Sequence, residues 1–291
     1  MRITKALITA ANPNQRALPL QTLIDQNGEP KSVLAVLVTH VLSAGVDDVA
    51  VVICPEDEAP YRAVLGDLAR NVTFIPQSEP LGYADAILRA RSFTGRDPFL
   101  HLVGDHIYVS RSHQNCARRL IDVAQALSAP ISAVQLTRET LLRNFGAVGG
   151  RRAPERPGLY RVDVVLEKPT PTQAEQSLLV AGLRAGHYLC FFGMHALTPE
   201  VMDILDAQQR SPGDRRPTLS SALAELSRRS DYFALEDPDA RYDLGDRYGL
   251  FAAQFALALA GRDRSLILAR VLDLVAQYEP AADREAAGVT A

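Results

Sequence analysis

The chain of 291 residues contains no tryptophan and only three cysteines, and all of its apolar runs are short. Cys54, Cys116 and Cys190 are widely spaced and odd in number, so they form neither the close pairs of a metal site nor a disulfide framework. We therefore expect reduced thiols and a cytoplasmic location. No run approaches the roughly 18 apolar residues of a membrane-spanning helix, and the first residues predict a short strand rather than a signal peptide.

An excess of charge of one sign is also lacking. The 31 basic residues nearly balance the 34 acidic ones, so the net charge of −3 gives no argument for nucleic acid or a membrane surface as a partner. Hydrophobic residues make up 47% of the chain, which is enough for a large core. We expect a single domain over residues 1–278, with a helical extension from about 246 to 278 and a flexible tail over 279–291.

The first half of the chain alternates two hydrophobic patterns. Apolar stretches typical of buried strands occur at residues 6–10, 49–53, 72–75, 99–103 and 131–135. Stretches with helical periodicity lie between them, at residues 33–43, about 57–70, 84–91 and about 112–128. This alternation predicts βαβ units and a largely parallel sheet.

The second half is less regular. Expected strands occur at residues 147–148, 160–166, 187–194 and 232–235. Expected helices occur at residues 199–208, 219–228, 248–260 and 265–278. Together the two halves predict one mixed α/β fold that ends in helices.

A polar loop, Asn12-Pro13-Asn14-Gln15, follows the first expected strand and ends at Arg16. Its place suits a turn that binds phosphate. Its composition does not, because such turns are normally rich in glycine, which lets bare backbone approach the phosphate. Asparagine tolerates a positive φ better than most residues, whereas Pro13 removes one amide donor. Whether this loop can still bind phosphate therefore determines whether the protein can turn over a nucleotide.

Two aspartates stand where ligands bind in open α/β sheets. Asp105 follows the strand at 99–103, and Asp243 lies between a short strand and a helix. If the fold brings them together they could hold one Mg²⁺ against a triphosphate, because Mg²⁺ prefers carboxylate oxygens. A turn or helix cap is the alternative for each. His101, His106 and His113 lack the spacing of a helical metal pair, which argues against zinc.

Other polar groups stand at the ends of expected elements. Glu167-Lys168-Pro169 ends a strand, and its carboxylate suits sugar hydroxyls while its ammonium suits a phosphate; a surface ion-paired turn is the alternative. Gln77 offers a donor and an acceptor to a base, and Gly82 opens a helix; an ordinary loop is the alternative. Gly146 would let a sugar approach the backbone, and Tyr188 offers a polar tip.

The order of these segments resembles the sugar-phosphate nucleotidyltransferases, especially the bacterial glucose-1-phosphate uridylyl- and thymidylyltransferases. The resemblance covers about residues 3 to 260. Arg16-Ala17-Leu18-Pro19 stands where that family ends its phosphate loop. Glu167-Lys168-Pro169 matches the family's Glu-Lys-Pro, while Gly186-His187-Tyr188 and Asp243-Leu244-Gly245 are similar to its later Gly-x-Tyr and its second metal-binding Asp motif.

The resemblance implies a three-layer α/β/α sandwich with a mixed, mainly parallel Rossmann-like sheet. It implies Mg²⁺-assisted in-line transfer from a nucleoside triphosphate, with UTP or dTTP favoured, to a sugar 1-phosphate, with glucose 1-phosphate favoured. The residues it assigns are Arg16 for the β- and γ-phosphates, Ala10, Ala11, Asn12, Gln77 and Gly82 for the nucleotide, Asp105 and Asp243 for Mg²⁺, Lys168 for the sugar phosphate, and Gly146, Glu167 and Tyr188 for the sugar. The expected helices after residue 246 are candidate packing surfaces for a homo-oligomer.

The chain departs from the family pattern in two places. The family loop is typically Gly-x-Gly-[Thr/Ser]-Arg, and here it has no glycine. The segment Leu20-Gln21-Thr22 is shorter than its family counterpart and lacks a Pro-Lys whose lysine contacts phosphate; Lys31 is a candidate replacement. A second hypothesis is therefore a weak or inactive homologue that binds a nucleotide-sugar as a sensor or regulatory subunit.

Overall fold

A computed structural model describes residues 1–110, 114–211 and 216–278, so the tail predicted for 279–291 lies outside the described residues. The strands are β1 (Lys5–Thr9), β2 (Thr22–Ile24), β3 (Pro30–Ser32), β4 (Asp48–Ile53), β5 (Val72–Pro76), β6 (Phe99–Val103), β7 (His106–Val109), β8 (Ile131–Arg138), β9 (Gly146–Arg152), β10 (Leu159–Glu167), β11 (His187–Leu197), β12 (Phe233–Glu236) and β13 (Ala240–Asp243). The helices are α1 (Val33–Ser43), α2 (Glu58–Leu65), α3 (Tyr83–Arg89), α4 (Arg91–Thr94), α5 (Cys116–Leu127), α6 (Pro171–Ser177), α7 (Pro199–Arg210), α8 (Leu219–Arg229), α9 (Gly249–Ala260) and α10 (Arg264–Gln277).

Nine strands form one sheet in the order β5-β4-β1-β6-β11-β8-β12-β10-β9. The first four pair in parallel, as do β8 and β12. β11 runs antiparallel to β6 and β8, and β10 runs antiparallel to β9 and β12. The predicted mixed sheet is confirmed, but parallel pairing dominates only its first half. A short loop joins β9 to β10, and such a loop permits only antiparallel pairing.

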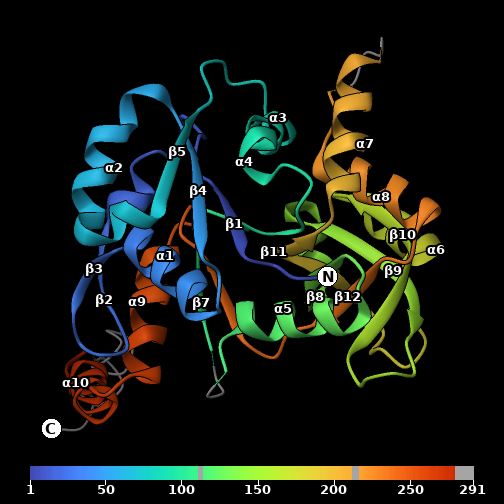
Figure 1. Ribbon diagram of the computed structural model, residues 1–291. Coiled ribbons are helices and arrows are strands. Elements are labelled where there is room, and N and C mark those ends of the chain that lie inside the picture. The colour runs from blue at the N-terminus through green and yellow to red at the C-terminus, as the bar shows by residue number, and fades with distance from the viewer. Residues whose placement is uncertain (111–113, 212–215, 279–291) are drawn as a thin grey trace, which may run out of the picture.

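Helices cover both faces of this sheet (Figure 1). Ile8 and Leu102 belong to one core cluster, which includes residues of α1, α5 and α9. Leu7 and Phe99 belong to another, which includes residues of α3, α7 and α8. Neighbouring strand residues point to opposite faces, so Leu7 and Ile8 serve different layers. The result is the predicted three-layer α/β/α sandwich.

Local signals set several element boundaries. α1 begins where predicted because the Ser32 hydroxyl accepts a hydrogen bond from the Ala35 amide, at 3.0 Å. It ends before Gly45, whose φ of +89° favours glycine. The Asn115 side chain caps α5 in the same way, through the Arg118 amide at 2.7 Å. This cap places the helix start after the predicted residue 112, which itself lies outside the described ranges.

Several short elements escaped the sequence prediction. β2 pairs with β3, and β7 pairs with β13, each as a small antiparallel sheet. The helix α6 begins with a capping box at Thr170. The helix expected at about 57–70 is α2 followed by a 3-10 helix over Gly66–Asn71, and the one expected at 84–91 is divided into α3 and α4. Strands of three or four residues carry too little periodicity to be found without their partners.

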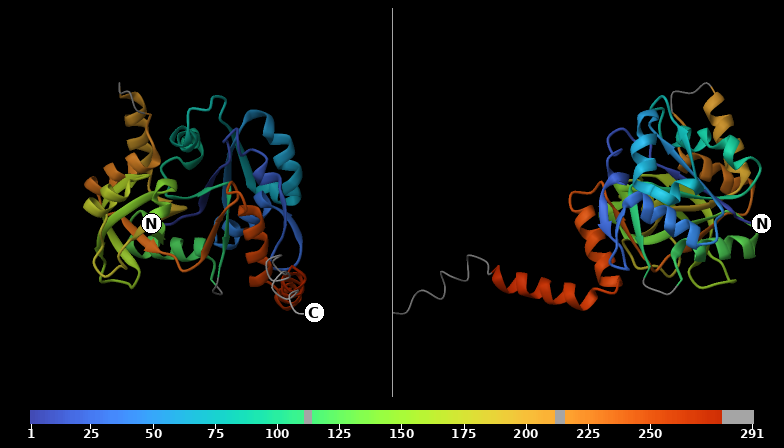
Figure 2. Two further views of the ribbon diagram at one scale, coloured as in Figure 1. Left: turned by 180° about the vertical axis from the view of Figure 1, so that it is seen from behind. Right: turned by 60° about the vertical axis from the view of Figure 1, so that its left-hand side comes forward.

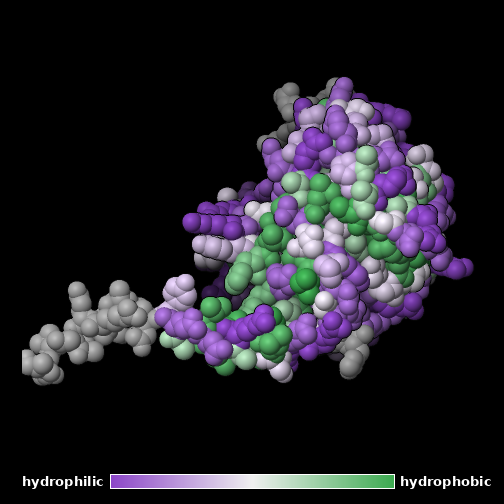
Figure 3. Space-filling model, turned by 90° about the vertical axis from the view of Figure 1, so that its left-hand side faces the viewer, coloured by the Kyte–Doolittle hydropathy of each residue, from purple (hydrophilic) through white to green (hydrophobic). Residues whose placement is uncertain are grey.

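The two C-terminal helices differ in how they pack. α9 packs on β2, β7 and β13, whereas α10 contacts α9 and contains no buried residue. Figure 2 shows α10 projecting from the rest of the molecule. Exposed apolar side chains on this pair include Phe251, Leu266, Leu272 and Val275, and hydrophobic residues gather on the same face in Figure 3. None of the described helices is both long and apolar enough to cross a membrane.

Buried histidines predict a stability that depends on pH. Burial lowers the pKa of His40 to about 4 and of His195 to about 3, and burial together with the neighbouring His195 lowers the pKa of His101 well below its usual value. The unfolded chain binds protons at these histidines below about pH 6.5, and the folded chain does not. We expect the free energy of unfolding to fall by about 1.4 kcal/mol per histidine for each pH unit below about 6.5, down to about pH 4.5. Urea unfolding across this range measures the slope; a flat profile would contradict it.

Candidate functional site

A cavity of about 350 Å³ opens at the C-terminal ends of β1 and β6. Its lining residues come from the first loop, the segment before α3, and the ends of the two strands: Thr9, Ala11, Asn12, Pro13, Gln15, Gln77, Pro80, Gly82, Tyr83, Ala86, Val103 and Asp105. Five residues predicted from the sequence are among them. Ala10 is buried next to this wall, and its amide donates to the Val52 carbonyl at 2.8 Å. The ends of parallel strands are where such sheets bind ligands.

The loop after β1 is closed by its own polar side chains. The Asn12 carboxamide oxygen accepts a hydrogen bond from the Asn14 amide at 3.1 Å, and the Asn12 carbonyl accepts one from the Gln15 amide at 3.0 Å. None of residues 12–16, all of which the structure describes, has a positive φ. Asparagine therefore shapes this turn through an Asx hydrogen bond, without the left-handed conformation that glycine supplies elsewhere.

Arg16 and Lys31, the two cations expected near the phosphates, form ion pairs with carboxylates of the protein. The Arg16 Nε donates to Asp57 Oδ1 at 2.9 Å, and its guanidinium also pairs with Glu56 at 3.5 Å. The Lys31 Nζ lies 2.7 Å from Asp25 Oδ2. Within the described part of the chain, the lining of the 350 Å³ cavity includes no lysine or arginine.

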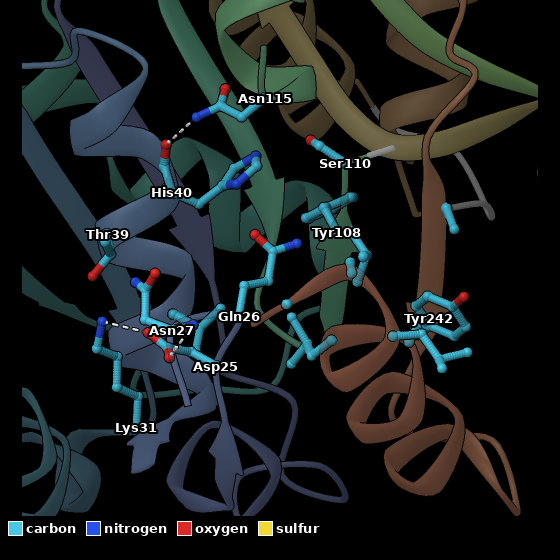
Figure 4. A pocket seen from close by; sticks show the side chains of 18 of the residues that line it. Asp25, Gln26, Asn27, Lys31, Thr39, His40, Tyr108, Ser110, Asn115 and Tyr242 are labelled. Carbon is cyan, nitrogen blue, oxygen red and sulfur yellow. Dashed lines mark hydrogen bonds and ion pairs between the residues drawn. The ribbon is translucent and has the colours of Figure 1, made fainter. Parts of the chain in front are cut away.

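Lys31 lines a second, larger cavity of about 1020 Å³ between α1, α9 and β7. Figure 4 shows Asp25 and Lys31 at one end, and Tyr108 and Tyr242 across from His40 of α1. None of the residues predicted for the nucleotide, the sugar or the metal lines this cavity.

The side-chain nitrogen of Gln77 is hydrogen-bonded within the protein, and its side-chain oxygen can still accept a hydrogen bond. Its Nε2 donates to Asp85 Oδ2 at 2.7 Å and to the Gly82 carbonyl at 3.1 Å, and the residue is only 6% exposed. These bonds use both amide hydrogens, so the acceptor Oε1 is the polar atom that Gln77, a lining residue, has left for a ligand. Gly82 has a φ of +104°, and a Cβ there would meet nothing within 4 Å. The backbone turn, rather than lack of space, therefore requires glycine.

Tyr83 is a site residue that the sequence did not reveal. Its hydroxyl lies 3.4 Å from ring nitrogens of the buried His101. Burial raises the pKa of this tyrosine, and the carboxylates of Asp105 and Glu167 raise it further. The predicted metal-binding and sugar-binding carboxylates therefore act on the same hydroxyl beside the cavity.

Asp105 and Asp243 meet through the pairing of β7 with β13. That register sets Asp243 opposite His106, and ligand atoms of Asp105, His106 and Asp243 all lie within 4.8 Å of one another. The Leu244 amide donates to the Asp105 carbonyl at 2.9 Å, which ties the two segments together. Burial raises the pKa of the Asp105 carboxyl, but the His106 hydrogen bond and the charge of Arg241 outweigh it, so the net shift is downward. Two carboxylates and an imidazole suit a divalent cation.

Arg241 is a second residue that sequence reasoning missed. Its guanidinium lies 4.2 Å from the ring centroid of Phe145 and donates to the Phe191 carbonyl at 2.7 Å. Burial lowers its pKa. It stands two positions before Asp243 in β13, so the two side chains share a face of that strand. The spacing of two residues between Arg241 and Asp243 could have indicated from the sequence that the two side chains lie together.

The residues predicted for the sugar lie along β9 and β10. Glu167 pairs in register with Gly146, and the Ser220 hydroxyl donates to its carboxylate. A Cβ at Gly146 would come within 2.7 Å of the Phe191 ring and 2.8 Å of Ser220 Oγ, so the position needs glycine. Tyr188 is only 3% exposed and belongs to a small core cluster that includes Ala174 of α6. Its ring is thus part of the core instead of the cavity lining.

Lys168 adopts a strained backbone conformation. Its φ is +47°, a region that costs a residue with a Cβ about 1–3 kcal/mol, and its amide donates to the Phe145 carbonyl at 3.1 Å. Strain of this kind is retained at functional sites. We expect Lys168→Gly to leave the free energy of unfolding unchanged or raise it by about 1 kcal/mol while activity falls. Lys168→Met should lose the same activity without the gain in stability; a Lys168→Gly variant that is less stable than wild type would contradict this reading.

Known proteins are similar to this chain in sequence and in fold. UTP–glucose-1-phosphate uridylyltransferase 2 of Streptococcus pyogenes is 28% identical over 285 residues, which cover 89% of this chain and 91% of that protein. The fold is similar to that of UDP-glucose pyrophosphorylase from Acinetobacter baumannii, with a TM-score of 0.72, 19% identity, and coverage of 94% of this chain and 99% of that one. A UDP-glucose pyrophosphorylase solved with UDP-glucose gives a TM-score of 0.70 at 20% identity, with coverage of 87% and 98%.

The family described as nucleotidyl transferase matches residues 19–258, most of the chain and both aspartate segments. With the sandwich fold and the paired aspartates, this match identifies the chain as a member of the nucleotidyl transferase family.

Proposed function

We propose that this protein transfers a uridylyl group from UTP to glucose 1-phosphate, giving UDP-glucose and pyrophosphate. One observation carries the proposal: Asp105 lies on the wall of the 350 Å³ cavity and also within a cluster with Asp243. A single carboxylate therefore faces both the nucleotide space and the position for a divalent ion. The uridylyltransferase relatives and the neighbour solved with UDP-glucose support the choice of substrates.

The Gln77 side chain is compatible with uracil or thymine as the base, and the choice of uracil over a purine comes from the uridylyltransferase relatives. Its Oε1 remains as an acceptor because its amide hydrogens are donated to Asp85 and Gly82. An acceptor on this wall suits a base edge that presents an N–H, as uracil and thymine do. Tyr83, on the same wall, offers a ring face for stacking.

The reaction itself needs positioning and charge stabilisation more than proton transfer. An oxygen of the sugar phosphate bonds to the α-phosphorus while the bond from that phosphorus to the bridging oxygen breaks, and pyrophosphate leaves with the electron pair. A Mg²⁺ held by Asp105 and Asp243 would neutralise phosphate charge. Glu167 would accept hydrogen bonds from sugar hydroxyls, and Lys168 would pair with the sugar phosphate to hold the attacking oxygen in line.

A panel of UTP, dTTP, CTP, ATP and GTP, each with several sugar 1-phosphates, tests the substrate assignment. Pyrophosphate release should be fastest with UTP or dTTP together with glucose 1-phosphate, and Gln77→Leu should reduce the preference for these bases. Fastest turnover with a purine triphosphate would refute the proposed role of Gln77.

The engagement of Arg16 favours one alternative function. Its guanidinium is paired with Asp57 and Glu56, and the described residues that line the cavity include no lysine or arginine to hold the β- and γ-phosphates. The protein would then be a weak or inactive homologue that binds a nucleotide-sugar as a sensor. Calorimetry separates the two functions: binding of UDP-glucose without binding of UTP supports the sensor, whereas tight UTP binding with Mg²⁺ rules it out.

A further inference from the structure

We propose that Arg241 binds the phosphate group of the sugar 1-phosphate, in a position between the metal-binding and the sugar-binding residues predicted from the sequence. The inference rests on the proposed function in taking a sugar 1-phosphate as the acceptor substrate. The family resemblance assigned this phosphate to Lys168 alone. Arg241 would be a second cation from a different part of the chain, since it lies on β13 whereas Lys168 directly follows β10.

Arg241 contacts the neighbours of the residues predicted for the sugar. Its guanidinium lies 4.2 Å from the ring centroid of Phe145, the residue just before Gly146. Its Nη1 donates to the Phe191 carbonyl at 2.7 Å, and the Phe191 ring is the group that a Cβ at Gly146 would meet at 2.7 Å. The Phe145 carbonyl accepts a hydrogen bond from the Lys168 amide at 3.1 Å. Phe145 therefore connects Arg241 to both Gly146 and Lys168.

Arg241 also lies close to the predicted metal-binding carboxylates. It stands two positions before Asp243 in β13, so both side chains project from the same face of that strand. Burial raises the pKa of the Asp105 carboxyl, but the His106 hydrogen bond and the positive charge of Arg241 outweigh it. Burial lowers the pKa of Arg241 itself, and the charge of Asp243 is among the influences that oppose this shift. The guanidinium therefore interacts electrostatically with both carboxylates.

The guanidinium of Arg241 has donors to spare. The residue is partly buried, yet among the described residues it forms no ion pair, and its hydrogen bonding there is limited to the Phe191 carbonyl. A guanidinium has five N–H groups, so Nε and Nη2 keep donors for a ligand. A cation removed from water is normally paired, because an isolated buried charge is costly. The missing partner is therefore expected to be an anionic ligand.

The chemistry and the place of this cation favour the acceptor phosphate. The planar fork of N–H donors matches two oxygens of a phosphate group. The proposed reaction requires the acceptor phosphate to lie between the divalent ion and the sugar, since its oxygen attacks the α-phosphorus. Arg241 stands between Asp243 and the Phe145 ring next to Gly146. It is not among the described residues that line the 350 Å³ cavity, which argues against a contact with the base.

A fixed cation at this point also offsets the charge of the carboxylates. Asp105 and Asp243 lie close together, and without cations they would repel a phosphate. A divalent ion held by them would neutralise part of that charge, and Arg241 adds a positive charge that the protein itself supplies. The acceptor phosphate could then approach the carboxylates from the side of the sugar.

Calorimetry of the full-length protein with UDP-glucose and with UMP, each with Mg²⁺, tests the inference. The phosphate of the sugar 1-phosphate becomes the sugar-side phosphate of UDP-glucose, whereas UMP has only the nucleotide-side phosphate. Arg241→Met should weaken UDP-glucose binding by about 10- to 100-fold, as expected for a lost charge-assisted hydrogen bond, and UMP binding by less than about threefold. Arg241→Lys keeps the charge without the fork and should recover part of the loss.

Arg152→Met is the matched control. The Arg152 guanidinium also lies over a ring, 5.4 Å from the Tyr160 centroid, and its Nε donates to the Ala181 carbonyl at 3.2 Å. Arg152 is exposed and stands at the opposite end of β9 from Gly146, so both affinities should stay at the wild-type value. Thermal melting checks that each variant is folded.

Three results would overturn the inference: equal losses of UDP-glucose and UMP binding in Arg241→Met, unchanged binding of both, or no UDP-glucose binding by folded wild type at millimolar concentration. A protein that releases pyrophosphate, but whose Arg241→Met variant binds UDP-glucose as tightly as wild type, would retain the proposed function and lose this inference. A protein whose UDP-glucose binding depends selectively on Arg241, but which turns over no triphosphate, would confirm the inference and lose the proposed function.

Discussion

Replacing Asp105 with asparagine is expected to lower kcat/KM for pyrophosphate release by about 10³-fold. The carboxylate lines the 350 Å³ cavity and lies close to Asp243, so on the proposed function its loss removes charge at the point where the ion and the α-phosphate would meet. Asparagine keeps the size of the side chain and can still pair with His106, so the fold should remain intact. The backbone bond from the Leu244 amide to the residue-105 carbonyl does not depend on the side chain.

Asp163→Asn is the matched control for that experiment. Asp163 lies on β10, its side chain is 46% exposed, and its partner Arg151 is also exposed. It should retain wild-type kcat/KM. If Asp105→Asn lost less than about tenfold, or lost no more than the control, the carboxylate would not stand at the reacting phosphate.

Replacing Arg119 with methionine is expected to lower the free energy of unfolding by about 3–5 kcal/mol. Arg119 Nη2 lies 2.9 Å from Asp237 Oδ1 and 2.6 Å from Asp239 Oδ2, and both carboxylate side chains are completely buried. Methionine preserves most of the volume but leaves two buried carboxylates without their cation. The cost of two buried negative charges that have lost the neighbouring guanidinium, more than the loss of an attractive pair, produces the large effect.

The same substitution should also weaken binding of a divalent ion at the candidate cluster of Asp105, His106 and Asp243. Asp237 and Asp239 stand just before β13, the strand that carries Asp243 to His106. Arg118→Met is the control, because the neighbouring Arg118 is half exposed and pairs with Asp122 one helical turn away; such a surface pair contributes about 0–1 kcal/mol. Urea unfolding gives the stabilities, and Mn²⁺ affinity gives the effect on the site. Similar destabilisation by both variants would contradict a structural role for the buried cluster.

Features with a strong local pattern could be predicted from the sequence. The periodic apolar residues of α1 predict that helix over residues 33–43, which are its observed bounds. β6 is apolar except for His101, which is enough to predict a buried strand, and the place of Asp105 just after it follows from the rule for ligand sites in open sheets. Gly82 was identified at a helix start, and its positive φ gives the physical reason for glycine there.

Features that depend on distant partners could not be predicted. β7 and β13 have four residues each, and only their pairing sets His106 between two aspartates. The attachment of Arg16 to Asp57 joins segments that no local pattern connects. The packing of Tyr188 beneath α6 likewise depends on a helix that was not expected. In each case a tertiary contact decides what a polar side chain faces.

Phosphorus-31 NMR of the protein with UTP, glucose 1-phosphate and Mg²⁺ or Mn²⁺ would establish whether the site performs nucleotidyl transfer. The expected result is loss of the UTP and glucose 1-phosphate resonances, with equal amounts of UDP-glucose and pyrophosphate formed, and no such change with Asp105→Asn. Unchanged resonances after prolonged incubation of the folded wild-type protein with either ion would contradict the proposed enzyme.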